Sequence, residues 1–182
     1  MAHYTVEQSR LTHFFFSDTR SAPLWLIVRL YVGYEWVTAG WEKVINPAWF
    51  GTNAGAALQG FIKGALSKTS GAFPDVQSWY ASFLQIMVLP HVVLWSNFVA
   101  VGEVLVGVGL ILGVLTGIAA FFGFFMNWNY LMAGTVSVNP QLLILSLGLM
   151  LAHRVAGYWG GDRYVLLLVH RWCRPRGFRT SR

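Results

Sequence analysis

Charged side chains stand inside apolar sequence in the first third of the chain. The segment from Gly33 to Gly51, GYEWVTAGWEKVINPAWFG, carries Glu35, Glu42 and Lys43. A charge within a membrane span costs about 2.5–3.5 kcal/mol on insertion scales, so such residues generally face other helices and find partners. Further polar residues in apolar surroundings are Arg29, Glu103, Asn127, Asn129, His153 and Arg154.

Helical geometry sorts these residues by depth, at about 1.5 Å per residue. The expected inner layer consists of Arg29, Glu103, His153 and Arg154. Within this layer, Arg29 and Glu103 are candidates for an ion pair. Glu35 is expected deeper, level with Asn127 and Asn129, whereas Glu42 and Lys43 are expected at the outer mouth.

The residue types suit proton handling at a membrane quinone. A quinone needs an apolar slot, hydrogen-bond donors for its carbonyls, and a carboxylate or histidine that can pass protons. The candidate catalytic residues are Glu103, Arg29 and His153. The candidate quinone-binding residues are Glu35, Asn127, Trp36 and Trp128. Two other interpretations stay open: buried pairs can only fix helix packing, and transporters use the same residue types.

The composition is that of an integral membrane protein. Of 182 residues, 55% are apolar and 11% are charged, against about 25% charged in a typical globular protein. The net charge of +6 is concentrated at the C-terminal end, which indicates a cytoplasmic tail beside lipid and excludes a nucleic-acid partner. The single cysteine, Cys173, excludes a dithiol mechanism within the chain, and no metal, haem or flavin motif is present.

Four segments are long and apolar enough to span a membrane. They are residues 22–44, 92–113, 115–136 and 141–159, within a single membrane domain of residues 22–173. Arginines before the first span and after the last predict that both termini lie in the cytoplasm of a prokaryotic-type membrane. The flanking parts are then a cytoplasmic segment, residues 1–21, an inner interfacial helix, residues 162–172, and a basic tail, residues 174–182. The first span also carries Gly33 and Gly40 on one face, which predicts close packing there.

The outer loop, residues 45–91, is expected to contain an interfacial helix that covers the bundle. Its sequence PDVQSWYASFLQIMVLPH begins with Pro74 and ends near Pro90, as helices bounded by prolines do. Helical spacing places Trp79, Phe83, Ile86 and Met87 on one face.

Three stretches together resemble the DoxX-like membrane family, and more closely its DoxD type, the small subunit of thiosulfate:quinone oxidoreductase. These are LIVRLYVGYEWVTAGWEKV, NFVAVGEVLVGVGLILGVLTGIAAFFGFFMNWNYLMAG and HRVAGYWGGDRYV. The resemblance implies a four-helix membrane bundle that works with a second subunit. It also implies oxidation of thiosulfate to tetrathionate with electrons passed to quinone. The family's polar positions match Arg29, Lys43, Glu103 and Asp162.

By this resemblance, thiosulfate would approach from outside and meet Lys43, Glu42 and His91. The alternative is a non-catalytic accessory subunit of a larger respiratory or photosynthetic complex, whose polar groups hold helices together. A transporter is less well supported, because no inverted repeat is visible. In each case the expected partners are the lipid bilayer and other membrane subunits.

Overall fold

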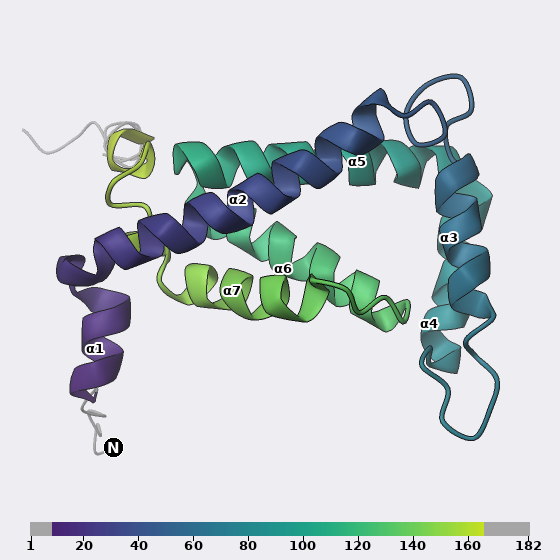
Figure 1. Cartoon of the computed structure of the whole chain (residues 1–182), viewed down its shortest axis with the longest axis horizontal. Coiled ribbons are helices and arrows are strands. Elements are labelled where there is room, and N and C mark those ends of the chain that lie inside the picture. The colour runs from purple at the N-terminus through teal and green to yellow at the C-terminus, as the bar shows by residue number, and fades with distance from the viewer. Residues whose placement is uncertain (1–8, 166–182) are drawn as a thin grey trace, which may run out of the picture.

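Four long helices run antiparallel between two ends of the molecule in the computed structural model, which describes residues 9–165 (Figure 1). They are α2 (Ala22–Ile45), α5 (Val92–Leu112), α6 (Thr116–Met132) and α7 (Asn139–Leu151). The described residues contain no strand, so the all-helical prediction is confirmed. The predicted bounds of the first span agree with α2 to within one residue at each end.

Glycines bring the backbones of α2 and α5 into direct contact. A Cβ atom on Gly40 would lie 2.6 Å from the backbone nitrogen of Val104, and one on Gly33 would lie 2.8 Å from the Ile111 side chain. A Cβ atom on Gly107 would overlap Val37. The close packing predicted for the Gly33 and Gly40 face is therefore confirmed, and it fixes the register of the two helices.

The helices turn sharply where the sequence predicts turns. Gly113 ends α5 with φ +64°, a left-handed conformation that glycine adopts without steric cost, and α6 begins at Thr116. Pro140 stands in the first turn of α7, where a proline is well tolerated because no backbone N–H is needed there.

The fourth predicted span, residues 141–159, is too long. The α7 helix ends at Leu151, and a single short helix, α8 (His153–Ala156), follows. Gly160 then passes so close to Gly113 that a Cβ atom would lie 2.8 Å from the Gly113 Cα atom. The chain leaves the helix here because the backbone pairs with the α5–α6 turn, where the Asp162 amide donates to the Gly113 carbonyl at 2.7 Å.

The outer loop contains more helix than predicted. The α3 helix (Ala56–Leu66) was not expected, and α4 (Ser78–Phe83) starts four residues after Pro74. Pro90 does not end a helix, because one π-helical turn (η2, Leu84–Val88) and one 3₁₀ turn (η3, Leu89–His91) carry the chain into α5. Such turns re-pair the backbone groups around a proline, so that α4 and α5 are one bent helix.

The helices α3 and α4 lie across one end of the bundle (Figure 1). Together with the η2 turn, they form a buried face that consists of Leu58, Ile62, Ala65, Tyr80, Leu84 and Val88. Trp79, Ile86 and Met87, which belong to the apolar face predicted for this segment, are exposed and point away from the bundle. Hydrogen bonds attach this layer to the bundle: Lys68 Nζ donates to the Gly134 carbonyl at 2.6 Å, and Tyr80 Oη lies 3.0 Å from the Asn129 carbonyl and 3.1 Å from Asn129 Oδ1.

At the opposite end, a helix that was not predicted precedes the first span. The α1 helix (Arg10–Ser17) is joined to α2 by a 3₁₀ turn, η1 (Thr19–Ser21). Trp25 Nε1 donates to the Phe15 carbonyl at 2.7 Å, which fixes the angle between α1 and α2. Residues 162–165 are helical, where an inner interfacial helix is predicted. The rest of that helix, Cys173 and the basic tail lie outside the described residues.

One continuous helix, Ser78–Leu112, is both long and apolar enough to cross a membrane. A second apolar helix, Asn139–Leu151, is shorter than a span requires. The four predicted spans therefore correspond to four bundle helices, of which one meets both criteria among residues 9–165.

Candidate functional site

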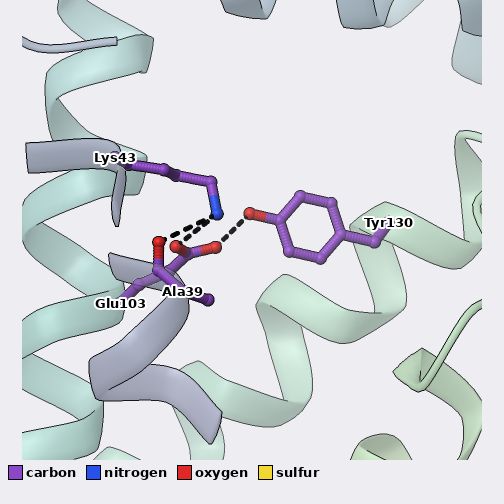
Figure 2. A network of polar contacts seen from close by, with 4 residues as sticks. All are labelled: Ala39, Lys43, Glu103 and Tyr130. Atoms are coloured by element: carbon purple, nitrogen blue, oxygen red, sulfur yellow. Dashed lines mark hydrogen bonds and ion pairs between the residues drawn. The ribbon is translucent and has the colours of Figure 1, made fainter. Parts of the chain in front are cut away.

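A buried ion pair lies at the end of the bundle that α3 and α4 cover. Because α2 and α5 cross at Gly40, Lys43 in the last turn of α2 faces Glu103 of α5, and Lys43 Nζ lies 2.7 Å from Glu103 Oε2 (Figure 2). The Glu103 side chain is 1% exposed and that of Lys43 19% exposed. The Lys43 ammonium also lies 5.3 Å from the centre of the Trp49 ring, where its charge attracts the ring electrons.

Tyr130 of α6 completes this network. Its hydroxyl donates a short hydrogen bond to Glu103 Oε1, so that each carboxylate oxygen has its own donor (Figure 2). A phenol, a carboxylate and an ammonium in contact can hold one proton in more than one arrangement, which suits proton exchange with a ligand. Sequence analysis missed Tyr130, although it lies three residues after Asn127 and so on the same helical face.

A cavity of about 290 Å³ opens beside the ion pair. Its polar lining consists of Glu35, Trp36, Lys43, Glu103, Asn127, Tyr130, Thr135, Ser137 and Asn139. Its apolar lining includes Trp49, Phe61 and Leu142. The wall thus combines aromatic surface with a few convergent polar groups, which is typical of small-molecule sites.

Two groups in the cavity wall have unused hydrogen-bonding capacity. Asn127 is fully buried, and neither its amide nitrogen nor its amide oxygen has a partner among the described residues. Trp36 Nε1 is likewise buried without an acceptor within residues 9–165. Buried polar groups are nearly always paired, so these atoms indicate where a ligand or water binds.

Five of the ten candidate residues meet at this cavity. They are Glu35, Trp36, Lys43, Glu103 and Asn127. Helix α2 supplies the first three through one face, and α5 and α6 supply the other two. Their roles in binding or catalysis stay predictions.

The other five candidates lie elsewhere. Glu42 and Trp128 are exposed on the outer faces of their helices. His91 is exposed and lines a separate surface hollow beside Asn97. His153 is exposed and contacts the Met150 carbonyl at 3.1 Å; it lies beside Gly117 at the start of α6. The predicted outer mouth of Lys43, Glu42 and His91 is therefore not assembled as one site.

The expected ion pair between Arg29 and Glu103 is wrong. Arg29 lies beside Gly113, about 15 Å of helix away from Glu103, and donates from Nη1 to the Ala156 carbonyl at 3.0 Å. The expected depth of each residue was counted from the end of its own helix. These helix ends do not lie at the same level, because α2 extends past the end of α5. The inner layer of four charges is therefore not formed.

Arg29 and Asp162 instead belong to a structural cluster at the end of the bundle where α1 lies. The Asp162 carboxylate accepts from the backbone N–H groups of Leu115 and Thr116, the latter at 3.0 Å, and so caps the start of α6. The Arg29 guanidinium fits beside Gly113 and Gly160, where a Cβ atom on either glycine would overlap it. The four polar positions carried over by resemblance thus form two clusters, one at each end.

Comparison with known proteins gave one match. No curated protein and no solved structure matched the chain. The model of one protein family, described as "TQO small subunit DoxD", matches residues 24–172. This range includes α5, α6 and α7, all but the first two residues of α2, both polar clusters and the covering helices. The chain therefore belongs to the DoxD family of membrane proteins.

Proposed function

We propose that this chain is the quinone-binding membrane subunit of a thiosulfate:quinone oxidoreductase complex. The observation that carries the proposal is the cavity itself, in which a buried ion pair, a tyrosine and an unpartnered asparagine line an aromatic slot. Family membership supports the complex to which the subunit would belong. A volume of about 290 Å³ is at the lower end for ligand sites, and it suits a ring-sized headgroup whose tail stays in lipid.

The charges in the cavity favour a neutral ligand. Lys43 is paired with Glu103 at 2.7 Å, and Glu35 adds a second carboxylate to the wall. No uncompensated positive charge therefore faces the cavity from the residues that line it. A dianion such as thiosulfate would be repelled, so we place its oxidation on the partner subunit or at the junction with it.

The proposed reaction divides between the subunits. Joining two thiosulfate ions into one tetrathionate releases two electrons, and a quinone takes up two electrons and two protons to become a quinol. In this chain, Asn127 and Trp36 would hold the headgroup through its carbonyl oxygens. Tyr130 and Glu103 would exchange protons with it, and Lys43 would keep the carboxylate oriented.

The proposal includes four membrane crossings by α2, α5, α6 and α7, with both termini in the cytoplasm. The antiparallel order of the four helices supports this topology. The cavity would then open toward the outer side, under α3 and α4.

A photoactive azido-quinone tests the ligand. The complex is purified gently from its native membrane, labelled, and digested for mass spectrometry. Label on peptides that line the cavity, competed by unmodified quinone, is expected. Trp36→Phe removes one donor and should raise the quinone KM roughly fivefold, the value of one hydrogen bond. The matched control is Trp128→Phe on the outer face, which should leave KM unchanged.

An accessory role without catalysis is the second candidate, and the buried pair of Lys43 and Glu103 is the observation that favours it. It predicts that Trp36→Phe and Asn127→Leu leave turnover unchanged in the assembled complex. If the cavity took up no quinone label and both variants kept full activity, the accessory role would be supported and the proposed quinone-binding role would be contradicted.

A further inference from the structure

One carboxylate in the cavity wall takes no part in the buried network. The acidic side chains that line the cavity are Glu35 and Glu103. Glu103 accepts hydrogen bonds from Lys43 and Tyr130, which occupy both of its oxygens. Glu35 has neither a hydrogen-bond nor an ionic partner within residues 9–165. It can therefore gain or lose a proton without breaking a contact between side chains.

Glu35 borders both the cavity and the molecular surface. It is half-buried on α2, and the cavity that it lines is also lined by Ser137, which is exposed, and by Asn139 at the start of α7. The cavity thus reaches the surface between α2 and the turn that joins α6 to α7. This turn lies at the end of the bundle that α3 and α4 cover (Figure 1), where Lys68 Nζ donates to the Gly134 carbonyl. Glu35 can therefore exchange protons with water at this opening.

Spacing along α2 separates Glu35 from the buried network. Glu35, Ala39 and Lys43 follow one another at intervals of four residues, so one face of the helix turns all three toward the cavity. A Cβ atom on Gly40 would lie 2.8 Å from Glu103 Cβ, which places the Glu103 backbone level with Gly40. Glu35 lies about 7.5 Å further along the helix. The two carboxylates therefore stand toward opposite ends of the cavity, and the small side chain of Ala39 forms the wall between them, where a flat ring can lie.

The reduction of a quinone needs a proton at each end of its ring, and this step of the inference rests on the proposed function. A quinone that accepts two electrons forms an O–H bond at each of its two carbonyl oxygens. In a para-quinone these oxygens lie on opposite sides of the ring, so one proton donor cannot reach both. Tyr130 and Glu103 lie at one end. Among the other side chains that line the cavity, Glu35 is the remaining carboxylic acid.

We propose that Glu35 supplies the second of the two protons that convert the quinone to a quinol. Two electrons arrive from the joining of two thiosulfate ions at the partner subunit. The network of Tyr130 and Glu103 protonates one carbonyl oxygen, and the Glu35 carboxyl group acts as a general acid toward the other. After the quinol leaves, water that enters through the opening between α2 and the α6–α7 turn returns one proton to each group.

Glu35→Gln tests this role, because the amide keeps the size and polarity of the side chain but is not an acid. In the assembled complex, kcat for thiosulfate-driven quinone reduction should fall about 100-fold, the loss of one general acid. Azido-quinone labelling of the cavity should stay unchanged. Glu35→Asp keeps the acid and should retain part of the activity. The matched control is Glu42→Gln, which alters an exposed carboxylate that does not line the cavity and should leave kcat unchanged.

An added small acid gives a readout that a purely structural role would not move. Glu35→Ala removes the carboxyl group and leaves space beside the opening of the cavity. Buffered formate or acetate should restore kcat of this variant in proportion to its concentration, because the free acid enters through the opening and donates in place of Glu35. Neither acid should change kcat of Glu42→Gln.

The outcomes separate the role of Glu35 from quinone binding. Full activity of Glu35→Gln, with normal labelling, would overturn the proton role alone. Loss of labelling together with activity would make Glu35 a binding residue instead, and failure of both acids to restore a labelled Glu35→Ala complex would also overturn the proposal. If the wild-type complex took up no azido-quinone label, the proposed function would fail, and the role of Glu35 would fail with it.

Discussion

The pairing of Lys43 with Glu103 decides what the buried charges at the covered end can do. A carboxylate that is 1% exposed would be strongly unfavourable alone, and here an ammonium and a phenol satisfy its two oxygens. Replacing both members of a buried pair is often nearly neutral, whereas removing one leaves the other uncompensated. The pair therefore makes a specific prediction about double substitutions.

Lys43→Met should lower the free energy of unfolding by about 3–5 kcal/mol, because it leaves the Glu103 carboxylate buried without its cation. Lys43→Met combined with Glu103→Gln should recover most of that loss. Thermal unfolding of the purified protein in detergent measures both effects. Lys63→Met on the exposed surface of α3 is the control and should change stability little. Equal destabilisation by the single and double variants would mean that the two charges are not coupled.

Residue types were predictable from the sequence, but their partners were not. Charges in apolar sequence are expected to face other helices, and this rule correctly selected Arg29, Glu103 and Asn127 for the interior. It also selected His153 and Arg154, which are exposed. The partner of each charged side chain depends on how far neighbouring helices are shifted along their axes. Gly40 and Gly107 set this shift between α2 and α5 through backbone contact, and it cannot be predicted from the type of any single residue.

At the scale of elements, the contact of α2 with α5 depends on glycine. Gly40→Ala would place a Cβ atom 2.6 Å from the Val104 nitrogen, so the helices must separate. We expect a loss of about 1–3 kcal/mol in stability and misalignment of Lys43 with Glu103.

The matched control for Gly40→Ala is Gly64→Ala in α3, where nothing lies within 4 Å of the added Cβ atom. Alanine should stabilise that helix by up to about 1 kcal/mol through its higher helix propensity. Thermal unfolding of both variants tests whether Gly40→Ala lowers the stability of the protein and Gly64→Ala raises it. A neutral Gly40→Ala would show that α2 and α5 are not in backbone contact.

The cluster that contains Arg29 and Asp162 makes a prediction about the start of α6. Asp162→Ala removes the acceptor for the backbone N–H groups of Leu115 and Thr116, and it should cost about 0.5–2 kcal/mol, as the loss of a helix cap does. Asp162→Asn keeps an amide oxygen as an acceptor and should retain part of that stability. Hydrogen exchange of the first turn of α6 measures the effect locally. Unchanged exchange there in Asp162→Ala would contradict the capping role.

At the scale of the whole molecule, hydropathy predicted where the four bundle helices lie in the sequence, although the fourth is shorter than predicted, and it predicted the covering layer poorly. Long apolar runs specify the four bundle helices, and Gly113 and Pro140 mark two of the turns. Pro90 suggested a boundary that the chain bypasses, because a π-helical turn and a 3₁₀ turn join α4 to α5. The α3 helix was not predicted from the sequence. Its buried face consists of Leu58, Ile62 and Ala65, and packing against α4 stabilises it.

The arrangement of the ends also predicts the orientation of the chain in its membrane. Helix α1 and the segment Gly160–Asp162 lie at one end of the bundle, and α3 lies at the other (Figure 1). Arginines gather at the α1 end, which should therefore face the cytoplasm. An even number of crossings then places Cys173, the one cysteine of the sequence, on that same side.

Labelling with a membrane-impermeant maleimide tests this orientation in intact cells. The wild-type protein should react at Cys173 only after the membrane is opened. Lys63→Cys in a Cys173→Ser background should react without opening, because Lys63 is exposed on α3 at the opposite end. If both proteins gave the same labelling pattern, residues 63 and 173 would lie on the same side of the membrane. The chain could then not cross the membrane an odd number of times between them. In that case the cavity could not be assigned to the side of the membrane opposite the arginine-rich end. The side from which it takes up protons would also need a new assignment.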